Sequence, residues 1–130
     1  MQILILGGTG AMGLPLVQIL SCENDVYVTS RKERASTGRI KYICGNAQNR
    51  TFLEGVLSSK NWDAVVDFMV RSEETLKDLA PLFLDNTKQY VFISSSRVYA
   101  ETEGLITETT PRLLEASTDK EYLKTKEYAL

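Results

Sequence analysis

The sequence contains no histidine. This absence excludes Ser-His-Asp triads, Cys-His nucleophile pairs and imidazole-ligated metals, so acid–base chemistry falls to tyrosine, lysine, serine, cysteine or carboxyl groups. Only two cysteines are present, Cys22 and Cys44, and their spacing is not that of a metal site. We therefore expect no bound metal and two buried, unpaired thiols.

An excess of charge of one sign is also absent, as are long hydrophobic runs. The sequence has 15 lysines and arginines and 17 acidic residues, and the resulting net charge of −2 does not favour nucleic acid or an anionic membrane as a partner. No apolar run has the length of a membrane span, and no secretory signal pattern opens the chain. With 130 residues, the chain is expected to form one cytoplasmic domain.

Short, β-rich apolar runs recur along the chain. They predict strands at residues 2–6, 26–29, 40–43, 64–68 and 90–93. Several of these runs are nearly continuous rather than alternating, which is typical of parallel strands covered on both faces.

Three of the segments between these runs have helical periodicity. Helices are expected at residues 13–21, 50–58 and 73–84, with Pro81 kinking or interrupting the last one, whereas the polar link at 30–39 is too short for a full helix. Alternating strands and helices predict right-handed crossovers and an α/β fold with a doubly wound parallel sheet in three αβα layers.

After the fifth strand, residues 100–121 predict a long surface loop, and the final stretch EYLKTKEYAL predicts the start of a helix. The architecture is thus expected to be truncated after about five strands. A fifth strand left at the sheet edge would favour self-association, so we expect a homodimer or larger species.

Glycines cluster where the first strand should turn into the first helix. In a G-x-x-G-x-x-G pattern, the first glycine permits a tight turn, the second lets the backbone approach a pyrophosphate, and the third packs helix on strand. Gly7, Gly10 and Gly13 fit these roles in order. The residues expected to bind a dinucleotide here are Gly7, Thr9, Gly10, Ala11, Met12 and Gly13.

The second strand should end beside the adenosine ribose of the dinucleotide. An acidic residue there suits the 2′-hydroxyl of NAD, and cationic residues suit the 2′-phosphate of NADP. Ser30, Arg31 and Lys32 occupy this place, and no aspartate or glutamate does. The sequence therefore favours NADP over NAD, although a solvated basic loop would look the same.

The wider glycine spacing resembles the short-chain dehydrogenase/reductase superfamily, in particular its extended branch, the NAD-dependent epimerase/dehydratase family. Three later stretches extend the resemblance: SSSRVYA at 94–100, ITETTP at 106–111 and YLKTK at 122–126. The resemblance implies a Rossmann-like fold over residues 1–130, with the C-terminal substrate-binding part lying beyond them.

The same resemblance implies the catalytic residues. Tyr122 would be the general acid/base, Lys126 would favour its ionisation and hold the nicotinamide ribose, and Ser95 would orient the substrate oxygen, with Ser96 as the alternative register. It further implies contacts of Asn46 with adenine and of Phe68 with the cofactor, although the family has an acidic residue and small residues, respectively, at these places.

Two functions follow as hypotheses. The first is an NAD(P)-dependent epimerase, dehydratase or reductase acting by hydride transfer on a nucleotide-sugar-like substrate, inactive as residues 1–130 alone. The second is a non-catalytic NAD(P)-binding sensor or regulatory module on the same fold.

Overall fold

The computed structural model describes residues 1–69, 71–93, 99–100 and 102–124. These form two compact units, Met1–Val70 with Asp78–Ile93, and Arg71–Lys77 with Ser94–Leu130.

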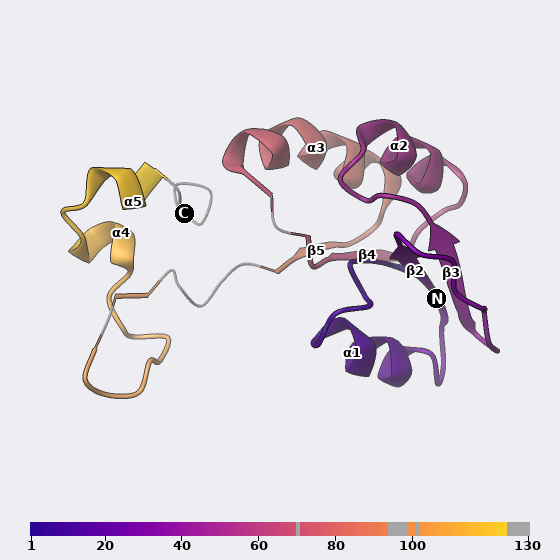
Figure 1. Ribbon diagram of the computed structural model, residues 1–130, viewed down its shortest axis with the longest axis horizontal. Coiled ribbons are helices and arrows are strands. Elements are labelled where there is room, and N and C mark those ends of the chain that lie inside the picture. Colours follow the sequence, from indigo (N-terminus) through magenta and orange to yellow (C-terminus); the bar gives the residue numbers. More distant parts are fainter. Residues whose placement is uncertain (70, 94–98, 101, 125–130) are drawn as a thin grey trace. The chain divides into compact units, whose positions relative to one another are not determined.

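The first unit is built on a five-stranded sheet in the order β3-β2-β1-β4-β5 (Figure 1). Its strands are β1 (Gln2–Leu6), β2 (Asp25–Ser30), β3 (Ile40–Cys44), β4 (Ala64–Asp67) and β5 (Tyr90–Phe92). The four pairings between neighbours are parallel. The α/β fold class and the doubly wound parallel sheet are therefore confirmed, and each strand lies within a residue of its predicted bounds at either end.

Helices cover both faces of this sheet. Helix α1 (Gly13–Leu20) lies on one face, and α2 (Arg50–Ser58) lies on the opposite face with the carboxyl-terminal part of α3 (Glu73–Asn86) (Figure 1). As predicted, β2 and β3 are joined without a helix; the chain turns at Gly38, whose φ of 57° is left-handed.

Alternation along β1 divides the core into two layers. Ile3 and Ile5 pack in the cluster that contains Val17 of α1. Leu4 and Leu6 pack in the other cluster, which is closed by residues of α2 and α3 together with Trp62. Because successive side chains of a strand point to opposite faces of the sheet, a strand that is apolar throughout contributes side chains to both layers of the core.

Two sequence expectations are wrong. Of the two effects expected of Pro81, a kink or an interruption, the interruption is wrong: helix α3 continues through Pro81, which lies on an exposed face, where the carbonyl that loses its helical donor can be hydrated. Both cysteines are unpaired, as predicted, but they are exposed rather than buried.

The second unit contains two short helices, α4 (Leu113–Ala116) and α5 (Lys120–Lys124). An isolated bridge pairs Tyr99 with Arg112, and Ala100 N–H donates to the Pro111 carbonyl at 2.8 Å. The surface loop predicted at residues 100–121 is thus largely exposed, but it includes α4 and the first two residues of α5. Among the described helices, none combines the length and the apolar character required to cross a bilayer.

A carboxyl group ties the amino ends of three strands together. Asp63, just before β4, accepts a hydrogen bond from Gln2 N–H at 2.8 Å and another from Lys88 Nζ at 2.7 Å. The bond from Lys88, followed by the bond from Gln2, lowers the pKa of Asp63 below its ordinary value.

We expect Asp63→Asn to lower the urea midpoint of unfolding near neutral pH. A depressed folded-state pKa contributes stability above the unfolded value of about 3.9, and this contribution disappears as the pH falls through the lower folded value. Urea unfolding of the unaltered protein and of Asp63→Asn, measured from neutral to acidic pH, checks the prediction. The difference between their urea midpoints should become smaller as the pH falls. A difference between the two midpoints that stays constant with pH would contradict the prediction.

Candidate dinucleotide site

A cavity of about 220 Å³ lies at the carboxyl edge of the sheet. It is lined by Gly7, Thr9, Thr29, Ser30, Arg31, Gly45, Asn46, Ala47, Gln48 and Met69. These residues come from the ends of β1, β2, β3 and β4 and from the turns that follow them. The strand order reverses between β1 and β4, and ligands of open α/β sheets bind at such switch points.

The turn after β1 depends on a glycine at its first position. Gly7 has a φ of 73°, a left-handed conformation that is costly for other residues. Its N–H donates to Thr29 Oγ1 at 3.3 Å, so the end of β2 helps to hold the turn. Gly10 N–H then donates to the Gly7 carbonyl at 3.2 Å, which closes the turn.

Gly10 and Gly13 differ in what surrounds them. A Cβ on Gly13 would lie 2.5 Å from Gly8 Cα, so close packing of helix on turn requires the glycine. A Cβ on Gly10 would meet only the Gly7 carbonyl oxygen, at an ordinary 3.6 Å. The fold itself therefore tolerates a side chain at Gly10, and the open space there fits a ligand that approaches bare backbone.

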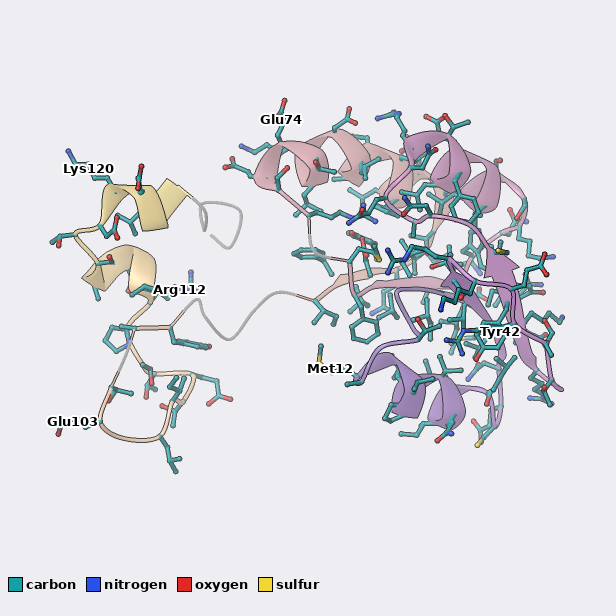
Figure 2. All side chains as sticks on the ribbon, in the orientation of Figure 1. Met12, Tyr42, Glu74, Glu103, Arg112 and Lys120 are labelled. Carbon is teal, nitrogen blue, oxygen red and sulfur yellow. The ribbon has the colours of Figure 1, made fainter. Side chains whose placement is uncertain are left out.

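The amino end of α1 has no side-chain cap. Its N-cap residue is Met12, whose side chain makes no capping hydrogen bond and projects from the helix (Figure 2). Helix α2, by contrast, is capped by Asn49, which accepts from Phe52 N–H at 3.0 Å. The first N–H groups of a helix attract anions when nothing else satisfies them. In the first turn of α1, Leu14 N–H donates to the Gly10 carbonyl at 3.0 Å and Pro15 has no N–H, so Gly13 N–H is the group that fits a phosphate.

At the end of β2, the Ser30 hydroxyl is engaged locally. It donates to the Lys32 carbonyl at 2.8 Å and accepts from Lys32 N–H and from Arg34 Nε. Ser30 therefore shapes the turn, which places Arg31 on the cavity wall and Arg34 beside the strand end. Figure 2 marks Tyr42 on β3, and the Arg34 guanidinium lies 5.8 Å from the centroid of its ring.

The loop after β3 supplies another wall. Asn46 Oδ1 accepts from Gln48 N–H at 3.0 Å, and the Asn46 carbonyl accepts from Asn49 N–H at 2.9 Å. These bonds lead the chain from the cavity into α2. The amide nitrogen of Asn46 is a hydrogen-bond donor of the kind that adenine acceptors require.

The structure places the predicted site residues in three groups. Those that line the cavity are Gly7, Thr9, Ser30, Arg31 and Asn46. Those outside its lining are Gly10, Ala11, Met12, Gly13, Lys32 and Phe68, the last of which packs against the α1-side core. Ser95, Ser96 and Lys126 lie outside the described residues, and Tyr122 lies in α5 with its side chain outside the description.

The residues expected to bind the cofactor do not include half of the cavity wall, namely Thr29, Gly45, Ala47, Gln48 and Met69. One signal could have found three of them: Thr29, Gly45 and Met69 lie within two residues of the carboxyl end of a correctly predicted strand. Within the described part of the chain, no three cysteine or acidic side chains gather where a metal ion could be held.

No protein-family model matches this sequence, and no curated protein matches it either. Solved structures do. The dTDP-glucose 4,6-dehydratase of Bacillus anthracis, in complex with NAD, is 21% identical with a TM-score of 0.66 over 99% of this chain and 48% of its own.

The UDP-glucuronic acid 4-epimerase of Bacillus cereus, in complex with NAD, is 18% identical with a TM-score of 0.61 over 86% of this chain and 45% of its own. The UDP-glucose 4-epimerase of Bifidobacterium longum, in complex with NAD+ and UDP, is 21% identical with a TM-score of 0.59 over 86% and 42%. The chain therefore has the Rossmann-like α/β fold of these enzymes and spans less than half the length of each.

Proposed function

We propose that this chain is the NAD(P)-binding portion of an epimerase, dehydratase or reductase of the NAD-dependent epimerase/dehydratase family, acting on a nucleotide-sugar-like substrate. One observation supports this more than any other. A cavity at the sheet's switch point adjoins a turn whose second glycine is open to a ligand and a helix whose amino end has no side-chain cap.

The groups around the cavity match the parts of a dinucleotide one by one. The N–H of Gly13, at the amino end of α1 that no side chain caps, would hold the pyrophosphate beside Gly10. Asn46 would meet the adenine, and the end of β2 would meet the adenosine ribose. When bound, the nicotinamide supplies hydride transfer, and the protein supplies position and proton transfer.

The proton-transfer residues are proposed from the sequence. Tyr122 would exchange a proton with the substrate oxygen, Ser95 would orient that oxygen, and Lys126 would stabilise the ionised phenol. These roles need a substrate-binding portion in addition to residues 1–130, which span 48% and 45% of the two enzymes compared in complex with NAD.

For the cofactor, we propose NADP rather than NAD. The neighbours described above contain NAD, but here the exposed Arg31 lines the cavity and Arg34 is fixed beside Ser30. A 2′-phosphate carries nearly two negative charges at neutral pH, which suits two guanidinium groups.

Calorimetric titration of NADP+ and NAD+ into the intact protein tests this proposal. We expect Arg31→Ala to weaken NADP+ binding about tenfold, the loss of one charge-assisted hydrogen bond, and to leave NAD+ binding unchanged.

Arg39→Ala is the matched control. Arg39 stands in the same connection but precedes β3 at the opposite edge of the sheet, where Nη1 donates to the Cys22 carbonyl. It should change neither affinity. Tighter binding of NAD+ than of NADP+ by the unaltered protein would refute the NADP assignment, and binding of neither would refute the dinucleotide site.

A further inference from the structure

An acidic side chain is buried two residues before Met69, which lines the cavity. Asp67 is the last residue of β4 and is 0% exposed. Burying a carboxyl group is costly unless it is hydrogen-bonded, so its partners indicate what the residue does. Full burial also prevents Asp67 from touching a ligand in the cavity.

The two oxygens of Asp67 bond to different parts of the fold. Oδ1 accepts from Met69 N–H at 2.8 Å, a contact two residues along the chain that is typical of an Asx-turn. Oδ2 accepts from the Tyr90 hydroxyl at 2.9 Å. The carboxyl group therefore joins the turn after β4 to the neighbouring strand β5.

Tyr90 is itself held firmly. Its ring stacks on Phe83 of α3 with centroids 4.5 Å apart and an interplanar angle of 8°. Phe83 is completely buried in the core layer on the α2 side. The hydroxyl thus provides Asp67 with a fixed donor.

Met69, at the other end of this chain of contacts, is part of the cavity wall. Its sulfur lies 3.2 Å from the position that a Cβ on Gly7 would take, so Met69 packs against the glycine turn. A shift of the Met69 backbone would therefore move the wall against which a dinucleotide would rest.

From these contacts we propose that Asp67 is a positioning residue for the dinucleotide site: supported by Tyr90, it fixes Met69 and so sets the affinity of the cavity for the cofactor. This inference rests on the proposed function. It assigns a role to a buried acid that neither the glycine motif nor the tyrosine–lysine pair involves.

The test compares dinucleotide binding and stability in the intact protein. Asp67→Ala should weaken binding of NADP+ and NAD+ alike by about fivefold or more, the low end of typical coupling between sites. Tyr90→Phe, which keeps the ring on Phe83, should act in the same direction. This pattern differs from that of Arg31→Ala, which is selective for NADP+.

A double-mutant cycle with Met69→Ala separates positioning from simple destabilisation. If Asp67 acts through Met69, Asp67→Ala in the Met69→Ala background should change the dissociation constants by less than about twofold. If Asp67→Ala does not fold, Tyr90→Phe takes its place in the cycle, and in the Met69→Ala background it too should change the dissociation constants by less than about twofold.

Asp63→Asn is the matched control, because Asp63 precedes the same strand and also accepts from one backbone N–H and one side chain. It should lower stability without changing cofactor affinity. Unchanged affinity in folded Asp67→Ala, or an equal loss in the Met69→Ala background or in Asp63→Asn, would overturn the inference while leaving the proposed function standing. Failure of the unaltered protein to bind either dinucleotide would overturn both.

Discussion

Gly10→Ala is expected to weaken dinucleotide binding about 10- to 100-fold while leaving the stability of the protein nearly unchanged. The new Cβ would meet only the Gly7 carbonyl oxygen at 3.6 Å, and Gly10 has no left-handed φ that alanine would strain. The same Cβ would occupy the space in which a pyrophosphate meets bare backbone. Calorimetric titration and urea unfolding of the same preparation measure the two effects.

Gly13→Ala is the matched comparison within the same turn. Its Cβ would lie 2.5 Å from Gly8 Cα and 2.6 Å from Gly8 C, so the backbone of the turn or of α1 must move. Such overpacking costs about 1–3 kcal/mol of stability. Gly13→Ala should therefore lose both stability and binding, whereas Gly10→Ala should lose binding alone.

This contrast makes the prediction specific to a ligand. If Gly10→Ala binds NADP+ and NAD+ as tightly as the unaltered protein does, no pyrophosphate approaches this turn, and the assignment of the glycine motif fails. If Gly10→Ala loses stability to the same extent as Gly13→Ala, its effect on binding is a consequence of unfolding.

Strands β1, β2 and β4 could be predicted closely because they are largely buried on both faces and therefore form short, nearly continuous apolar runs. The edge strands β3 and β5 are only partly buried, and their β-rich composition made them predictable. Leu4 and Ile5 are both fully buried, although they serve opposite layers of the core. Pro81 shows the limit of local rules: a proline inside a helix predicts a break, but exposure of its face decides whether the helix continues.

The site was less predictable than the fold because its walls come from strands far apart in sequence. The glycine turn is local, and Gly7, Thr9, Ser30 and Arg31 could be named from the first two strands alone. Met69 joins them only because β4 pairs with β1 in the sheet. Asp67 in an apolar strand had no visible purpose until β5 brought the Tyr90 hydroxyl within 2.9 Å of it.

Tyr122→Phe in the intact protein is expected to reduce turnover about 10²- to 10⁴-fold, the usual contribution of a positioned general acid or base. Cofactor affinity should stay nearly constant, because Tyr122 is proposed to exchange a proton with the substrate and not to hold the dinucleotide. UDP-glucose, UDP-glucuronic acid and dTDP-glucose, after which the enzymes compared above are named, form the first substrate panel.

Tyr128→Phe is the matched control, since both tyrosines follow a glutamate in the same terminal stretch, at Glu121 and Glu127. It should leave turnover within about twofold, because the tyrosine–lysine pattern of the family resemblance falls on Tyr122 and Lys126, which are spaced i, i+4. Loss of turnover in Tyr128→Phe but not in Tyr122→Phe would transfer the acid–base role to Tyr128 and remove Lys126 from its proposed place.

The same pair of variants separates the enzyme from the sensor. A protein that binds a dinucleotide for regulation has no proton to transfer, so both phenylalanine variants should bind the cofactor as before, and no member of the panel should turn over in any of the three proteins. In an enzyme, removal of the phenolic oxygen of Tyr122 should nearly abolish turnover and leave the affinity for the cofactor unchanged. Tight cofactor binding without turnover in the unaltered protein would therefore favour the sensor, and a selective loss in Tyr122→Phe would establish the enzyme.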